Sequence, residues 1–228
     1  MTEYQDSADQ ILDAALTHVI FDGWSESTFR TAITDSDVPP ALARAMFPRG
    51  AVDLALAWHD RGDAEMVARL EAADLADLRV RDRIATAIRY RIEAIDDKEV
   101  MRRSATFFAL PQHAPDGARA LWRTCDLIWT TLGDSSDDVN WYTKRATLSG
   151  VYSAVLLYWL GDSSDESTAT WEFLDRRIDE VMRIENLKAQ VQDNPLLKPF
   201  LVVPNWFLGQ IRPPRERDDL PGTVYRRR

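Results

Sequence analysis

The chain has 228 residues, enough to bury a sizeable core, and its 28 Lys and Arg residues face 37 Asp and Glu residues, for a formal net charge of -9 at pH 7. This acidic balance disfavours binding to nucleic acid, because affinity for phosphates rests on Lys and Arg side chains. The single cysteine, Cys125, excludes an internal disulfide, and no uninterrupted apolar stretch of about 18 residues is present to cross a bilayer.

Apolar residues recur with a helical period from the first segment to nearly the last, and no alternating run bounded by turn residues predicts a strand. The first helix carries a stripe made of Ile11, Leu12, Ala15, Leu16, Val19 and Ile20, and it stops at Gly23. Ser25 can cap a second short helix, and a third begins after the Pro39–Pro40 turn. Longer helices are predicted at about residues 51–75, 79–95, 97–109, 115–132, 140–160 and 166–192. The predicted fold class is all-α.

The helix predicted at 140–160 differs from the others because its apolar residues lie on all sides. Leu148 and Tyr152 share one side of this helix, whereas Leu157 and Tyr158 occupy the other. A helix that is apolar all round belongs in the interior of its domain. We therefore expect the bundle to wrap around residues 148–160.

Three short helices followed by longer ones resemble the TetR-type layout, which predicts a bundle of about nine or ten helices. Residues 1–50 would form a helix-turn-helix-like module, residues 51–193 a helical bundle, and residues 194–228 a tail. Such a module reads DNA with its last short helix. Residues 1–60 hold three basic residues against ten acidic ones, and only Arg44 and Arg49 lie near the candidate reading helix. We expect no binding to nucleic acid, and a TetR-type transcription regulator is the alternative function.

No pattern for catalysis, metal binding or a cofactor is present in the sequence. His18, His59 and His113 are far apart and form no H-x-x-x-H or E-x-x-H arrangement. There is no glycine-rich phosphate loop. The acidic pairs Asp96–Asp97 and Asp137–Asp138 fall at helix starts, where carboxylates favour the positive end of the helix dipole. We expect no catalytic residue, no metal ligand and no cofactor, and hence a protein that is not an enzyme.

The bundle is rich in aromatic residues. They are Phe107, Phe108, Trp122, Trp129, Trp141, Tyr152, Tyr158, Trp159, Trp171 and Phe173. Aromatic rings bury large areas and dominate packing, so a well-filled core would explain them. Taken alone they favour that interpretation, and the alternative is that they line an apolar cavity, because ligand pockets are mostly apolar and lie between the helices of bundles. Composition leaves both interpretations open.

Two groups of motifs in the second half of the chain resemble a known family. The first runs Gly133-Asp134-Ser135, Asp138-Val139-Asn140-Trp141-Tyr142-Thr143-Lys144-Arg145, Leu148 and Val151-Tyr152. The second runs Asp162-Ser163-Ser164, Thr170-Trp171-Glu172-Phe173-Leu174 and Arg177. Together, over roughly residues 97–182, they resemble the signature of the ubiquinone-biosynthesis accessory family, the ninth of the Coq proteins.

The resemblance implies a TetR-like fold that binds lipid in place of DNA and forms a homodimer. It further implies that the protein binds isoprenoid or quinone lipid and presents substrate to the di-iron hydroxylase that converts demethoxyubiquinone. The expected lipid-binding residues are Phe107, Phe108, Trp129, Leu148, Tyr152, Leu156 and Trp159. Asp138, Trp141 and Tyr142 match the family segment associated with partner contact. An exposed Trp–Tyr pair at a helix start is the kind of anchor that supports an interface.

Eukaryotic members of that family carry a mitochondrial presequence, whereas this chain begins with acidic and polar residues. We therefore expect a bacterial member that is cytoplasmic and peripheral to the inner membrane.

The tail contains an apolar segment marked by Lys198, Asn205 and Arg212, which recur every seven residues. It is too short and too often interrupted by proline to cross a membrane, but it could lie in a membrane surface next to the arginines that follow. The expected membrane-contacting residues are Lys198, Phe200, Leu201, Trp206, Phe207 and Leu208. Packing of this segment on the bundle or on a dimer mate is the alternative.

Overall fold

The computed structural model describes residues 2–193, and this part of the chain contains helices and no strand. The helices are α1 (Thr2–Asp22), α2 (Glu26–Asp35), α3 (Pro40–Met46), α4 (Ala51–Ala72), α5 (Val80–Glu93), α6 (Lys98–Ala109), α7 (Ala114–Thr131), α8 (Val139–Gly161) and α9 (Thr168–Asp193), with a short 3-10 helix (Asp165–Ser167) before α9. The predicted all-α class is confirmed for these residues. The predicted membrane segment, with Lys198, Phe200, Leu201, Trp206, Phe207 and Leu208, lies outside them.

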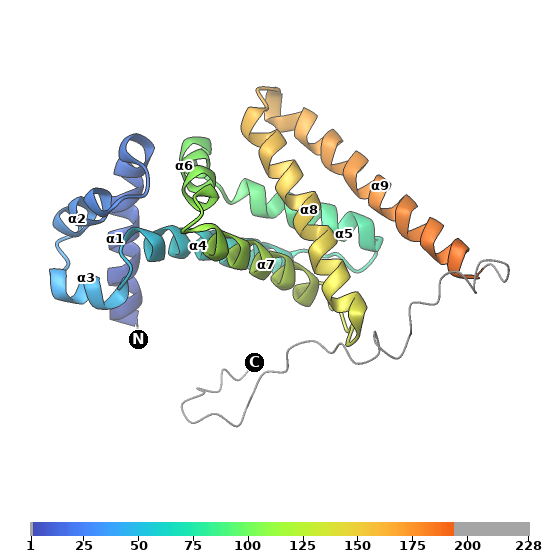
Figure 1. Cartoon of the computed structure of the whole chain (residues 1–228), viewed down its shortest axis with the longest axis horizontal. Helices are drawn as coiled ribbons and strands as arrows, with labels where there is room; N and C mark the ends of the chain where they lie inside the picture. Colours follow the sequence, from blue (N-terminus) through green and yellow to red (C-terminus); the bar gives the residue numbers. More distant parts are fainter. Residues whose placement is uncertain (1, 194–228) are drawn as a thin grey trace.

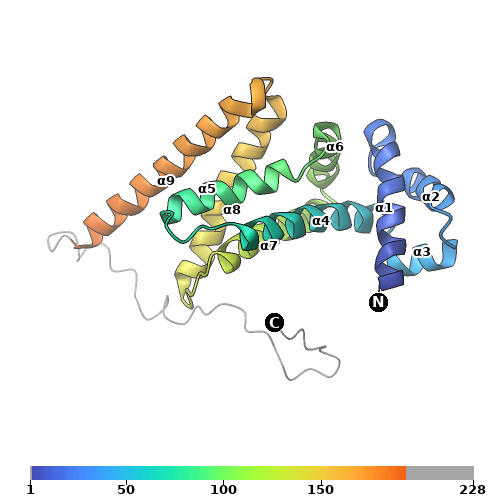
Figure 2. The ribbon, with the colours of Figure 1, turned by 180° about the vertical axis from the view of Figure 1, so that it is seen from behind.

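The molecule is elongated, with α1–α3 gathered at one end and α8 and α9 at the other (Figure 1). The long helices α4 and α7 pack against each other and connect the two ends. Seen from behind, α5 lies across α4 and reaches toward α9 (Figure 2). None of the described helices is long and apolar enough to span a membrane.

The predicted helix starts are confirmed where a capping residue marks them. Ser25 accepts a hydrogen bond from the backbone N–H of Thr28 at 3.1 Å and begins α2. Asp97 and Asp138 likewise accept from the N–H groups two residues later, at 2.6 and 2.8 Å, and begin α6 and α8. Each cap satisfies a donor that the first helical turn leaves unpaired, which is why these positions could be read locally.

The three N-terminal helices share their core with the helices that follow; α2 and α3 are short, as predicted, but α1 has 21 residues and is not. Phe29 of α2 and Phe47 after α3 meet edge to face, with ring centroids 6.2 Å apart. Trp24 donates from Nε1 to Ser104 Oγ of α6 at 2.8 Å, so a buried hydrogen bond ties the N-terminal helices to the bundle. Because this core continues into α4 and α6, the boundary predicted at residue 50 stays a prediction.

The expectation that α8 is enclosed on all sides is wrong within the described chain. Leu148, Tyr152 and Trp159 are buried against the neighbouring helices. On the opposite side, Leu157 is 65% and Tyr158 is 39% exposed. The reason is that α8 packs mainly on α7 and α9, which leaves its outer face, defined here by Leu157 and Tyr158, only partly covered by the described helices.

A buried polar network joins α4, α5 and α7. Arg91 and Asp63 are each 2% exposed, and Arg91 Nε donates to Asp63 Oδ1 at 2.6 Å. Thr124 Oγ1 donates to the same carboxylate at 2.9 Å, and His59 Nε2 lies 2.8 Å from Thr124 Oγ1. A Cβ on Gly62 would lie 2.6 Å from Arg91 Nη1, so glycine is what allows the guanidinium to lie against α4.

This network predicts an asymmetric response to substitution. Arg91→Met should lower the free energy of unfolding by about 3–5 kcal/mol, because it leaves the Asp63 carboxylate buried without its counter-ion. The double variant Asp63→Leu/Arg91→Met should regain most of that loss, since no charge remains buried. Urea unfolding followed by circular dichroism measures both. If the double variant is as unstable as Arg91→Met alone, the lost free energy of unfolding comes from altered side-chain shape and not from the unpaired charge of Asp63.

Candidate functional site

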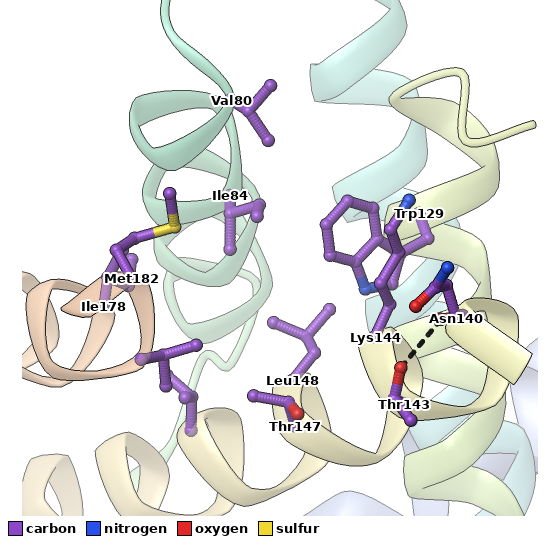
Figure 3. A pocket seen from close by; sticks show the side chains of 12 residues that line it. Val80, Ile84, Trp129, Asn140, Thr143, Lys144, Thr147, Leu148, Ile178 and Met182 are labelled. Carbon is purple, nitrogen blue, oxygen red and sulfur yellow. Dashed lines mark hydrogen bonds between the residues drawn. The ribbon is translucent and has the colours of Figure 1, made fainter. Parts of the chain in front are cut away.

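A half-enclosed apolar cavity of about 260 Å³ lies between α5, α8 and α9, and we call it the α8–α9 cavity. Its lining residues are Val80, Ile84, Trp129, Asn140, Thr143, Lys144, Thr147, Leu148, Val151, Ile178, Val181 and Met182. In Figure 3, Val80 and Ile84 of α5 and Met182 of α9 lie on one side of it, across from Trp129 of α7 and Lys144 of α8. The cavity is therefore apolar over most of its wall and polar at one end.

The second cavity, about 310 Å³, lies between α4, α6, α7 and α8, and we call it the α6–α8 cavity. Phe108, Tyr152 and Leu156 contribute to its wall. His59 also lines it, and burial together with the charges of Arg91 and Arg123 lowers the pKa of His59 to about 3. This imidazole is therefore neutral at physiological pH and adds no charge to the wall.

The residues predicted to bind lipid do not form one site. Trp129 and Leu148 line the α8–α9 cavity, whereas Phe108, Tyr152 and Leu156 line the α6–α8 cavity. Phe107 and Trp159 line neither of these two cavities. Phe107 stacks on His113, with ring centroids 4.2 Å apart. Trp159 is buried, and Lys98 Nζ lies 4.8 Å from its ring centroid. The set is divided because the two cavities meet different stretches of α8: the α8–α9 cavity takes its α8 residues from positions 140–151, and the α6–α8 cavity takes them from positions 152–157.

Sequence reasoning missed the walls that α5 and α9 contribute to the α8–α9 cavity. These are the aliphatic residues Val80, Ile84, Ile178, Val181 and Met182. They belong to no motif, and their helical spacing indicates only that they lie on an apolar face. Which apolar faces border a cavity depends on how the helices cross.

The residues predicted to contact a partner form part of an aromatic cluster, defined by Trp122, Trp141 and Tyr142. Trp141 and Tyr142 meet edge to face at 4.8 Å between centroids, and Trp122 of α7 lies 5.9 Å from the first ring and 6.4 Å from the second. Asp138 begins α8 directly before them. Both rings are half-buried, less open than the exposed pair expected from the sequence.

Asp134 holds the loop at residues 132–138 against the start of α8. Its carboxylate accepts from Lys144 Nζ at 2.7 Å and from Arg145 Nη1 at 3.0 Å. Burial alone would raise the pKa of Asp134, but the hydrogen bonds from Lys144, Ser136 and Arg145 lower it to about 2. Arg145 is itself buried, and its guanidinium lies 4.0 Å from the Trp141 ring centroid. The Gly-Asp-Ser and Lys-Arg parts of the motif therefore form one clamp.

The second group of motif residues fixes the start of α9. Asp162 accepts from Thr170 Oγ1 at 2.6 Å and from the backbone N–H of Thr170 at 3.0 Å. Hydrogen bonds from Thr170 and then Ser164 lower the pKa of Asp162 below its usual range. Trp171 Nε1 donates to the carbonyl of Glu166 at 2.9 Å. These residues serve to position α9, and through it Ile178 and Met182 of the cavity wall.

Among the described residues, no group of three or more His, Cys, Asp and Glu side chains is placed to hold a metal ion. Cys125 is fully buried, and burial raises the pKa of its thiol to about 11. At neutral pH this thiol is protonated and enclosed, as expected for a small core residue.

The comparison with known families gives one match, to the family described as COQ9, over residues 114–185. The chain is similar to the ubiquinone biosynthesis protein COQ9 of Drosophila melanogaster, with 31% identity over 80% of this chain and 57% of that protein. It is 34% identical to COQ9-A of Xenopus laevis over 80% of this chain and 60% of that protein. For human COQ9 the identity is 28% over the same shares. All three are named mitochondrial. The chain thus spans about three fifths of the length of the relatives it matches.

A TetR transcriptional regulator from Nitrosomonas europaea has a similar structure, with a TM-score of 0.63 and 22% sequence identity. The match covers 76% of this chain and 96% of the regulator. At this identity the likeness shows the fold alone, and it confirms the predicted TetR-like architecture.

Proposed function

Because the chain belongs to the COQ9 family, we propose that it acts in ubiquinone biosynthesis as a lipid-binding accessory protein and not as an enzyme. In this proposal it binds isoprenoid or quinone lipid in the α8–α9 cavity and presents it to the demethoxyubiquinone hydroxylase. The observation that carries the proposal is the position of that cavity. Ten of its twelve lining residues lie within residues 114–185, the segment that matches the family.

The chemistry of the cavity supports a lipid. Leu148 and Val151 of α8 face Ile84 of α5 and Ile178 of α9, and no acidic side chain lines the wall. Mostly apolar cavities with a few polar groups at one end are the usual sites for small apolar ligands. The α6–α8 cavity takes seven of its fifteen lining residues from outside residues 114–185, so we assign the lipid to the α8–α9 cavity.

A TetR-type regulator is the alternative function, and the charges near α3 disfavour it. Arg44 Nη2 donates to Glu26 at 2.6 Å. Arg49 pairs with Asp53 at 2.7 Å and with Asp116 at 3.1 Å. Arg44 and Arg49, the two basic side chains near α3, are therefore already paired with carboxylates. DNA phosphates would have to displace these carboxylates to bind the two arginines. A gel shift with genomic DNA fragments tests this alternative directly.

Lipid binding predicts that filling the α8–α9 cavity expels the ligand. Val151→Trp should remove most of the lipid that co-purifies with the protein, because the indole occupies the space of the ligand. Leu156→Trp is the matched control, since it places the same indole side chain in the α6–α8 cavity. Mass spectrometry of lipids released from each purified variant measures the outcome.

The melting temperature must be read with the lipid content, because overpacking a filled core costs about 1 to 3 kcal/mol. If both variants keep equal lipid, or if the parent protein carries none, the assignment of lipid to this cavity fails. If Leu156→Trp alone loses lipid, the α6–α8 cavity is the binding site.

We propose that the aromatic cluster contacts the hydroxylase. Trp122 extends the pair Trp141–Tyr142 across α7 and α8, so the three rings present one half-buried surface beside Asp138. Tyr and Trp are the residue types that most often dominate the binding energy of interfaces.

The variant Trp141→Ala/Tyr142→Ala should weaken hydroxylase binding by about 2 kcal/mol or more, roughly 30-fold in Kd. Titration of the purified hydroxylase by calorimetry measures this loss. Leu110→Ala, an exposed apolar residue at the end of α6, is the control and should bind normally. A variant that stays folded and binds the hydroxylase with unchanged affinity would exclude the cluster from the interface.

We propose that the outer face of α8 is the homodimer surface. Leu157 and Tyr158 are exposed, and Tyr158 stacks on Phe173 of α9 with ring centroids 4.4 Å apart and planes at 5°. Exposed apolar side chains of α8 and the Phe173 ring of α9 therefore lie next to each other near the turn that joins these two helices.

Leu157→Glu should convert the dimer to a monomer, because a carboxylate buried in a dimer interface without a counter-ion is strongly unfavourable. Light scattering during gel filtration measures the mass. Phe21→Glu is the control, since Phe21 is an exposed apolar residue of α1 and does not belong to this surface. A parent protein that elutes as a monomer, or a Leu157→Glu variant that remains dimeric, contradicts this surface.

We further propose that the protein works in the cytoplasm at the surface of the inner membrane. The support is the apolar and basic composition of residues 195–228, with Lys198, Trp206 and Phe207 as contacts.

A further inference from the structure

The indole N–H of Trp129 is a buried donor without an acceptor. Its Nε1 atom is shielded from solvent, and no hydrogen-bond partner for it occurs among the described residues. The other buried side-chain atoms without a hydrogen-bond partner are the Nε atoms of Arg81, Arg103 and Arg177. These three side chains each form an ion pair with a carboxylate, whereas the Trp129 indole has no other polar atom. Buried donors are nearly always bonded in folded proteins, so each exception requires an explanation.

Trp129 stands where the α8–α9 cavity meets a polar cleft of about 370 Å³. Val80, Trp129 and Lys144 line both spaces. Figure 3 shows the indole beside Lys144 at the polar end of the cavity, opposite Val80 and Ile84. The unpaired donor is therefore located at the boundary between apolar wall and polar cleft, where the head group of an amphiphile would lie.

Lys144 supplies a second donor at the same place. Its ammonium lies 5.2 Å from the Trp129 ring centroid and donates to Asp134 and Ser136, both at 2.7 Å. An ammonium has three N–H bonds, so one remains for a ligand. The Trp129 indole and the Lys144 ammonium thus both line the polar end of an apolar cavity, and a ligand group bound by either donor must be a hydrogen-bond acceptor.

We propose that the indole N–H of Trp129 anchors an oxygen atom of the lipid head group, with Lys144 as the neighbouring donor and the apolar tail extending between α5 and α9. This inference rests on the proposed lipid-binding function and adds the orientation of the lipid. The head group then lies beside residues 140–144 of α8, the same turns that carry Trp141 and Tyr142. The end of the lipid that must reach an enzyme is placed next to the aromatic cluster.

Two sources could supply the acceptor. A quinone ring offers carbonyl oxygens, and a phospholipid offers phosphate oxygens. Arg83 lines the polar cleft and donates to the carbonyls of Leu78 and Ala76 at 2.8 and 2.7 Å, while no described carboxylate pairs with it. Asp134 also lines the cleft, but its carboxylate already pairs with Lys144 and Arg145. A neutral quinone and an anionic phosphate are therefore both tested, and what they share is an oxygen atom that accepts a hydrogen bond.

The test observes the indole N–H itself. The full-length protein is stripped of lipid, labelled with 15N-tryptophan and titrated separately with a short-chain isoprenoid quinone and with short-chain phosphatidic acid. The Trp129 signal is assigned by its absence from the spectrum of Trp129→Phe, or of Trp129→Tyr if the first variant does not fold. It should move downfield on addition of the ligand that supplies the acceptor, because hydrogen bonding deshields the proton.

Affinity gives the matched comparison. Trp129→Phe should bind the same ligand about three- to tenfold more weakly, the equivalent of one hydrogen bond. Trp171→Phe removes an indole outside the cavity wall, whose N–H is already bonded to Glu166, and should bind normally.

A shift with the quinone alone identifies the ring as the head group, and a shift with phosphatidic acid alone identifies a phosphate; both support the anchor. A ligand that binds without moving the Trp129 signal, and with equal affinity for Trp129→Phe, overturns the anchor while leaving lipid binding intact. A parent protein that binds neither ligand overturns the lipid-binding function together with the anchor.

Discussion

The ion pairs of Asp134 with Lys144 and Arg145 hold the end of α7 against the start of α8, and both halves of the candidate site depend on this clamp. Lys144 is thereby fixed beside Trp129 at the polar end of the α8–α9 cavity. Arg145 is fixed under the Trp141 ring and so orients the aromatic cluster. Because one carboxylate binds both cations, the cavity and the proposed partner surface cannot move independently at this point.

Helix α8 has a different role on each of its sides. One side borders the α8–α9 cavity, a second borders the α6–α8 cavity, and the outer face with Leu157 and Tyr158 is open. An all-round apolar helix would normally be enclosed, and here the open face calls for a second surface to cover it. The same hydrophobic composition therefore lines two cavities and forms a partly exposed face, depending on position along and around one helix.

The family motifs separate into residues that build the scaffold and residues that remain available for binding. Asp134, Arg145 and Asp162 are engaged in ion pairs and caps within the chain. Trp141 and Tyr142 keep partly exposed rings, and Trp129, whose indole N–H is unpaired among the described residues, lies just before the first motif. A motif read from sequence combines both kinds, because neither burial nor hydrogen bonding is visible in residue spacing.

The sequence by itself determined the helical class, the helix starts at Ser25, Asp97 and Asp138, the acidic character and the family resemblance. These depend on residues within about four positions of each other or on composition, so they can be read without knowing the packing. Only the tertiary structure decided that Trp129 and Leu148 face a different cavity from Tyr152 and Leu156, and that α5 and α9 complete the first of them. Those contacts join residues far apart in the chain, and they arise from the angles at which helices cross, which the period of apolar residues does not specify.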